Sequence, residues 1–205
     1  MAVFFFFAML LGAALQITNT FGGTFLEDFK FNYSNSFGVR HPNLLLSISQ
    51  ISETLFILTI PFFFSKFGIK RVMIISIFAW VLRFGLFGLG NPGDGLILLV
   101  LSMVIYGMAF DFFNISGSLF VEKEADRSIM ASAQGLFMLM TNGIGAFLGG
   151  GFSGWVVDHF TANGVRDWQS IWFSFAGYAL ALGLVFPFVF NYKHESEKHT
   201  QPVLH

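Results

Sequence analysis

The residues best suited to bind a ligand or transfer a proton are polar side chains near the centres of long apolar segments. Asp111 is the only charged residue between Leu96 and Phe120, a stretch otherwise made almost entirely of apolar, aromatic and small residues. An ionisable group at mid-bilayer costs about 2.5–3.5 kcal/mol even on the mildest insertion scale. We therefore treat Asp111 as a functional residue, suited to binding a polar ligand or to carrying a proton.

Three of the apolar segments carry polar pairs at helical spacing. The pairs are Gln16 with Asn19, Gln50 with Glu53, and Asp111 with Asn114. Because residues three apart share one face of a helix, each pair would point in one direction. Pairs at similar depth on separate helices predict the lining of one polar cavity, with Tyr106 and Phe110 just before Asp111.

Each of these residues also has a simpler structural interpretation. Amides within a membrane can serve as hydrogen bonds between helices, worth about 0.6 kcal/mol each. Arg83 could pair with Glu53 or with Asp111, which leaves at least one acid without a fixed cation. Removal from water favours the neutral form of a carboxyl group, so that acid could take up and release a proton. Aromatic residues are more typical of packing in a chain with 30 phenylalanines.

The composition sets the class of protein. The chain has 205 residues, of which 55% are hydrophobic and 11% charged, and its mean hydropathy is +0.69. Soluble domains carry about 25% charged residues, so this chain has too little polar material to cover a core in water. The net charge of -1 argues against a nucleic-acid partner, and the lack of cysteine excludes disulfides, thiolate metal sites and cysteine catalysis.

The apolar segments predict an all-α membrane protein with six transmembrane helices. A spanning helix needs about 20 mostly apolar residues. The expected spans are about 2–26, 44–64, 72–89, 96–120, 129–157 and 168–190, which make residues 1–192 a six-helix bundle and leave 193–205 as a polar cytoplasmic tail. A signal peptide at the start is disfavoured, because no basic region precedes the apolar run and the run continues past a cleavage site.

Basic residues in the loops predict the orientation. Seven lie on the side of the two termini and three on the other side, while Arg83 lies within the third span. The seven are Lys66, Lys70, Arg71, Lys123, Arg127, Lys193 and Lys198, and the three are Lys30, Arg40 and Arg166. Because cytoplasmic loops are enriched in Lys and Arg, both termini are expected in the cytoplasm.

Glycines cluster in the fifth span, and they favour packing over catalysis. Gly145 with Gly149, and Gly150 with Gly154, have the small-xxx-small spacing of closely packed membrane helices. No phosphate-binding loop, HExxH motif or nucleophile elbow occurs in the sequence. An intramembrane enzyme is therefore disfavoured, and neither a metal nor an organic cofactor is expected.

Longer stretches resemble the nucleoside:proton symporter family of the major facilitator superfamily. They include "LQITNTFGGTFL", "SISQISETLFILTIPFF", "YGMAFDFFNISGSLFVEKE", "ASAQGLFMLMTNGIG" and "DWQSIWFSFAGY", in order and with matching spacing over almost the whole chain. "SKFGIKRVM" also resembles the loop signature between the second and third helices of a major facilitator half.

The resemblance implies a nucleoside importer of the bacterial inner membrane that uses protons as its coupling ion. The implied nucleoside-binding residues are Gln16, Asn19, Gln50, Glu53, Tyr106, Phe110 and Asp111. In this interpretation the amides and acids bond ribose hydroxyls and base edges, the aromatic rings stack on the base, and Asp111 and Glu53 couple to protons.

The resemblance covers only the C-terminal half of the family's twelve-helix pattern, in which substrate binds between two six-helix halves. We therefore expect an N-terminal half as a partner. The chain could be a fragment, a split gene product or a truncated transporter. The alternative function is a non-transporting membrane scaffold, or relic, of the same family.

Overall fold

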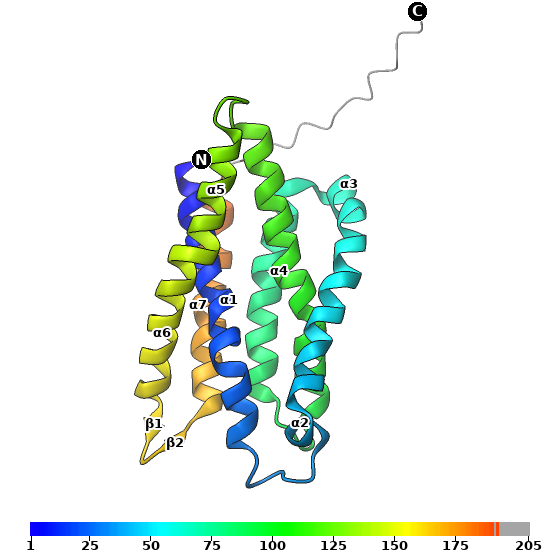
Figure 1. The fold of residues 1–205 in the computed structure, drawn as a ribbon, viewed down its shortest axis with the longest axis vertical. Coiled ribbons are helices and arrows are strands. Elements are labelled where there is room, and N and C mark those ends of the chain that lie inside the picture. Colours follow the sequence, from blue (N-terminus) through cyan, green and yellow to red (C-terminus); the bar gives the residue numbers. More distant parts are fainter. Residues whose placement is uncertain (191, 193–205) are drawn as a thin grey trace, which may run out of the picture.

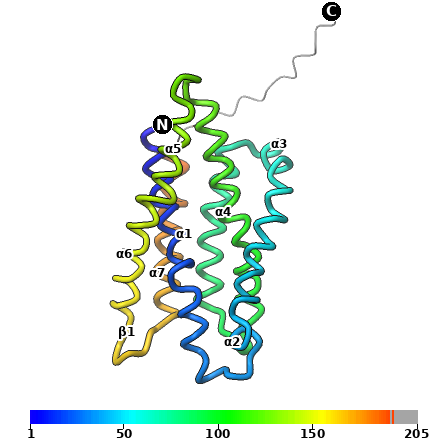
Figure 2. Tube along the Cα trace, in the orientation of Figure 1, coloured from blue at the N-terminus to red at the C-terminus, as the bar shows by residue number. Residues whose placement is uncertain are grey.

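The structure is a computed structural model that describes residues 1–190 and Tyr192; the expected polar tail, 193–205, lies outside these residues. Figures 1 and 2 show long helices standing side by side. The elements are α1 (Ala2–Asp28), α2 (Phe37–Arg40), α3 (Pro42–Leu89), α4 (Leu96–Glu124), α5 (Met130–Met138), the π-helix η1 (Leu139–Gly145), α6 (Ala146–His159), β1 (Thr161–Ala162), β2 (Val165–Arg166) and α7 (Trp168–Val189).

Five helical segments in the described residues are long and apolar enough to cross a membrane, where the sequence predicts six spans. The difference lies in α3, whose 48 residues cover two of the expected spans. A straight helix of that length would measure about 72 Å, more than twice the apolar thickness of a bilayer. Its helical path is broken at Gly68, where φ is 72° and ψ is 168°. Glycine adopts this left-handed φ without strain, and the chain reverses direction there (Figure 1).

The α4 helix packs closely against α3. A side chain at Gly107 would place its Cβ 2.6 Å from the carbonyl oxygen of Ser52, so only glycine allows this approach. The Ser52 hydroxyl donates to the carbonyl of Val104 and accepts a bond from the Gly107 amide at 3.3 Å. In the second part of α3, the Ser76 hydroxyl donates to the carbonyl of Ala109 at 2.5 Å. These bonds fix the register of the two helices.

A second close contact joins α1 to the η1–α6 segment. Side chains at Gly12 and Gly145 would collide with the backbone of the opposing helix, and one at Gly149 would lie 2.5 Å from the carbonyl oxygen of Ala13. The first predicted glycine pair therefore does permit close helix approach. The second pair does not do so within the described residues, because a Cβ added at Gly150 or Gly154 would have nothing within 4 Å of it.

A polar cluster at the C-terminal end of α1 connects this helix to the β1–β2 hairpin and to α7. Asp28 accepts hydrogen bonds from Arg166 at 2.8 and 3.0 Å and from the indole of Trp168 at 2.9 Å. Asp167 caps α7, accepting bonds from the Ser170 amide and hydroxyl. These bonds from Ser170 hold the pKa of Asp167 below its ordinary value. The cluster ties the end of α1 to the β1–β2 hairpin and the start of α7.

Candidate functional site

A polar cavity of about 250 Å³ lies between α1, α3 and α4. Its lining residues are Thr18, Asn19, Gly23, Leu46, Ser49, Gln50, Glu53, Arg83 and Tyr106. Gln50 is eight residues from the start of α3 and Tyr106 ten residues from the start of α4, so both lie about 12–15 Å from the helix ends. The cavity is therefore about a third of the way along α4 and the first part of α3. Small-molecule sites typically measure about 300–1,000 Å³, so this cavity is slightly below their range.

Four of the seven predicted site residues line this cavity: Asn19, Gln50, Glu53 and Tyr106. The two amides can each donate and accept hydrogen bonds, and the carboxyl of Glu53 accepts them. The side-chain oxygens of Tyr106 and Glu53 are close enough to interact electrostatically across this wall. The wall therefore offers donors, acceptors and one aromatic ring, which together suit a polar, uncharged ligand with hydroxyl groups.

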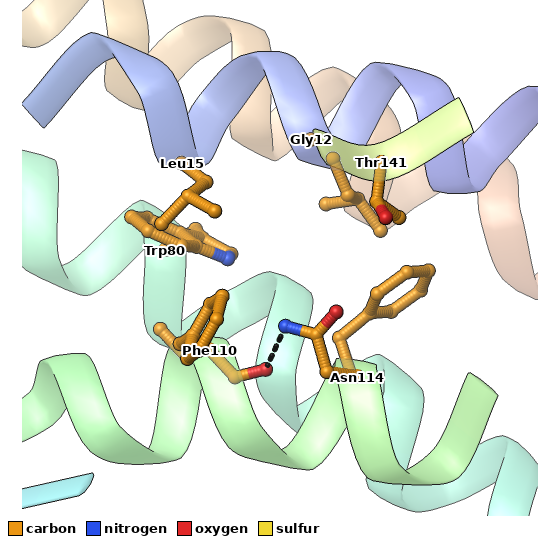
Figure 3. A pocket seen from close by; sticks show the side chains of 9 residues that line it. Gly12, Leu15, Trp80, Phe110, Asn114 and Thr141 are labelled. Carbon is orange, nitrogen blue, oxygen red and sulfur yellow. Dashed lines mark hydrogen bonds between the residues drawn. The ribbon is translucent and has the colours of Figure 1, made fainter. Parts of the chain in front are cut away.

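Phe110 continues the aromatic surface but lies at a second cavity. Its ring is parallel to that of Tyr106, with an interplanar angle of 3° and centroids 5.7 Å apart. The second cavity, shown in Figure 3, is only about 10 Å³ and lies among α1, η1, α3 and α4. The Asn114 amide at this cavity donates to the carbonyl of Phe110 at 3.1 Å (Figure 3). Asn114 is thus engaged by its own helix.

Asp111 is buried between helices and is not among the lining residues of either cavity. It is 6% exposed, and its Oδ2 has no hydrogen-bond partner among the described residues. It lies four residues after Gly107, on the side of α4 that faces α3. Its carboxyl is near enough to Glu53 for the two charges to interact. Asp111 is therefore close to Glu53 but outside the lining of the two cavities.

Gln16 also departs from the expectation of a single cavity lined by every polar pair. Its side chain donates to the Thr20 hydroxyl at 3.3 Å, along its own helix, and it lines neither cavity. Residues three apart differ by about 60° around a helix, so only one member of a pair need face a narrow cavity. On α1 only Asn19 of its pair lines the cavity, whereas on α3 both Gln50 and Glu53 do.

Arg83 reaches the cavity without an ion pair to either acid in the described residues. Its Nη1 instead donates to the carbonyl of Ser102 at 2.8 Å. The sequence identifies Arg83 only as a partner for a carboxylate, and it gives no sign that Thr18 and Ser49 line the cavity. Their position directly before Asn19 and Gln50 in the sequence was the available signal for these two.

Comparison with known proteins decides the family. The profile described as nucleoside H+ symporter matches residues 1–195. The chain belongs to this family. The predicted resemblance to nucleoside:proton symporters is therefore confirmed, and the chain is an integral membrane protein related to permeases.

Two relatives from the nucleoside H+ symporter family are about twice as long as this chain. The chain is 61% identical over 201 residues to the xanthosine permease of Escherichia coli (strain K12), covering 97% of this chain and 48% of that permease. It is 61% identical over 197 residues to the nucleoside permease NupG of the same organism, covering 95% of this chain and 47% of NupG. The chain thus spans about half the length of these relatives.

Solved structures agree with the sequence comparison. The crystal structure of the nucleoside transporter NupG matches with a TM-score of 0.89 and 61% identity, covering 94% of this chain and 48% of that one. A crystal structure of a NupG point mutant also matches with a TM-score of 0.89, at 60% identity and covering 93% of this chain and 48% of that one. The helical arrangement described above is therefore that of one half of a NupG-like transporter.

Proposed function

We propose that the chain is the C-terminal six-helix half of a major facilitator that imports nucleosides together with protons. The observation that carries this proposal is the polar cavity, in which Asn19, Gln50, Glu53 and Tyr106 meet inside the bundle of a nucleoside H+ symporter family member. The break of α3 at Gly68 supports six spans rather than five. The 48% coverage of the relatives supports an N-terminal half that completes the cavity.

The cavity residues have different roles in binding the nucleoside. Asn19 and Gln50 bond ribose hydroxyls and base edges, because amides match groups that both donate and accept. Tyr106 and Phe110 form the aromatic surface on which the base stacks, and Gln16 joins the site when the second half is present. Glu53 and Asp111 exchange protons with the two sides of the membrane during alternating access, in which the halves rock about the shared site.

Nucleoside binding tests this proposal directly. The chain is co-expressed with the half of E. coli NupG that it does not match, and the purified assembly is titrated with uridine by calorimetry. The Glu53→Gln variant removes a charged acceptor and keeps the side-chain size. Loss of a hydrogen bond to a charged group costs about 1.5–3 kcal/mol, so we expect uridine affinity to fall about ten- to a hundredfold.

The matched control for Glu53→Gln is Glu27→Gln. Glu27 is an exposed acid near the end of α1 that pairs with Lys30 at 3.5 Å, away from the polar cavity. We expect this variant to bind uridine like the native assembly. Equal affinity in Glu53→Gln and Glu27→Gln would remove Glu53 from the binding site.

The proposed location is the bacterial inner membrane, with both termini in the cytoplasm, as the loop charges favour. The chain contains no cysteine, so single cysteines can be introduced at exposed loop positions. In intact cells we expect Asn163→Cys, in the β1–β2 hairpin, to react with an impermeant maleimide and Ser128→Cys to be protected. The reverse labelling pattern would invert the orientation.

A further inference from the structure

Arg83 is a buried cation whose local bonding leaves it incompletely compensated. The side chain is 2% exposed, and it lies in the second part of α3. Its Nη1 donates to the Ser102 carbonyl, while its Nε has no partner among the described residues. A buried charge is strongly destabilising when it lacks a partner. One neutral carbonyl does not account for retaining a cation at this depth, so other contacts must be considered.

The guanidinium group is stacked on the aromatic wall of the cavity. Its Cζ lies 4.3 Å from the ring centroid of Tyr106 and 5.3 Å from that of Phe87. A planar guanidinium over an aromatic face is an attractive arrangement that is strongest away from water. The side-chain oxygens of Tyr106 and Glu53 are in turn close enough to interact electrostatically. Arg83, Tyr106 and Glu53 are therefore neighbours, and all three line the polar cavity.

We propose that Arg83 is a positioning residue, which holds the Tyr106 ring and, through its hydroxyl, the Glu53 carboxyl in their ligand-binding orientation. This inference rests on the proposed nucleoside-binding function of the cavity. It differs from a role in fastening α3 to α4, for which the bond from Arg83 to Ser102 and the return bond from the Ser102 hydroxyl at 3.0 Å would be sufficient.

Arg83→Gln separates the two roles. Glutamine keeps an amide N–H that can donate to Ser102 and removes the cation above Tyr106. If Arg83 positions the ring, uridine affinity of the two-half assembly falls about tenfold, and Arg83→Lys, which keeps a cation, restores most of it. If Arg83 only fastens the helices, Arg83→Gln binds like the native assembly. Ser102→Ala, which removes only the return bond, serves as the packing control and should bind normally.

A double-mutant cycle provides the decisive measurement. If Arg83 acts through Tyr106, the variant carrying both Arg83→Gln and Tyr106→Leu, which removes the ring beside the guanidinium, binds uridine about as well as the weaker single variant. Independent effects would instead multiply, and that result, or failure of Arg83→Lys to restore binding, would overturn the inference. A native assembly that binds no uridine would overturn the proposed function itself, whereas native binding with multiplying effects would reject only the role of Arg83.

Discussion

Replacing Asp111 by asparagine is expected to abolish nucleoside uptake driven by a pH gradient. Asparagine keeps the shape of the side chain and one carbonyl acceptor, but it cannot take up or release a proton. The carboxyl is 6% exposed, and its Oδ2 has no partner among the described residues, so nothing there commits it to a structural ion pair. Exchange of nucleoside across the membrane should persist in this variant, because exchange requires no net proton movement.

The same variant also reports on binding. We propose that in the two-half assembly Asp111 also accepts a hydrogen bond from the nucleoside. Loss of a hydrogen bond to a charged group costs about 1.5–3 kcal/mol, so uridine affinity should fall about ten- to a hundredfold. Uptake is measured against external pH in the two-half assembly, beside calorimetry, with Asp126→Asn in the exposed loop after α4 as the control. Pure acceptor behaviour would lower affinity and leave the pH dependence intact. Unchanged pH-dependent uptake together with unchanged uridine affinity would reduce Asp111 to a structural residue.

The chain alone is expected to show no concentrative nucleoside uptake. Alternating access requires two halves that move about a shared site, and the chain spans 48% of the NupG chain that it matches. Its cavity of about 250 Å³ is bounded here by α1, α3 and α4 only. In liposomes under an inward pH gradient, the purified chain should therefore leave radiolabelled uridine at background levels.

Addition of the second half should restore uptake to well above background in the same liposomes. The matched control is the second half alone, which should be inactive. A homodimer could substitute in principle, because major facilitator halves are related by pseudo-symmetry. The oligomeric state is therefore measured in detergent beside the transport assay. Robust uptake by a monomer of the 205-residue chain would contradict the two-half proposal.

The sequence predicts the parts of this structure that depend on local patterns. Apolar runs of sufficient length indicate the membrane helices, and small residues at spacing four indicate the close contact of Gly145 and Gly149 with α1. Polar residues within apolar runs identify Asn19, Gln50 and Glu53, which do meet at one cavity. These predictions succeed because burial in lipid makes each polar group and each glycine informative by its position alone.

Features that depend on the relative rotation of helices could not be predicted in the same way. The sequence does not distinguish Asn19, which faces the cavity, from Gln16, which does not, because both lie on one broad helix face. It also does not show that Asp111 lies outside the lining of the two cavities described here. The π-helical turn at Leu139–Gly145 has no signal in the sequence pattern, since the wider turn depends on how the segment packs against α1.

Both cavities lie where α1 meets the α3–α4 pair, next to the close backbone contacts of α1 with η1 and of α3 with α4. The polar cavity therefore leaves room for a ligand between α1 and α3. A ligand that touches both helices would add contacts between them and shift the thermal unfolding equilibrium toward the native state. At a hundred times its Kd, such a ligand adds about 2.7 kcal/mol to the free energy of unfolding.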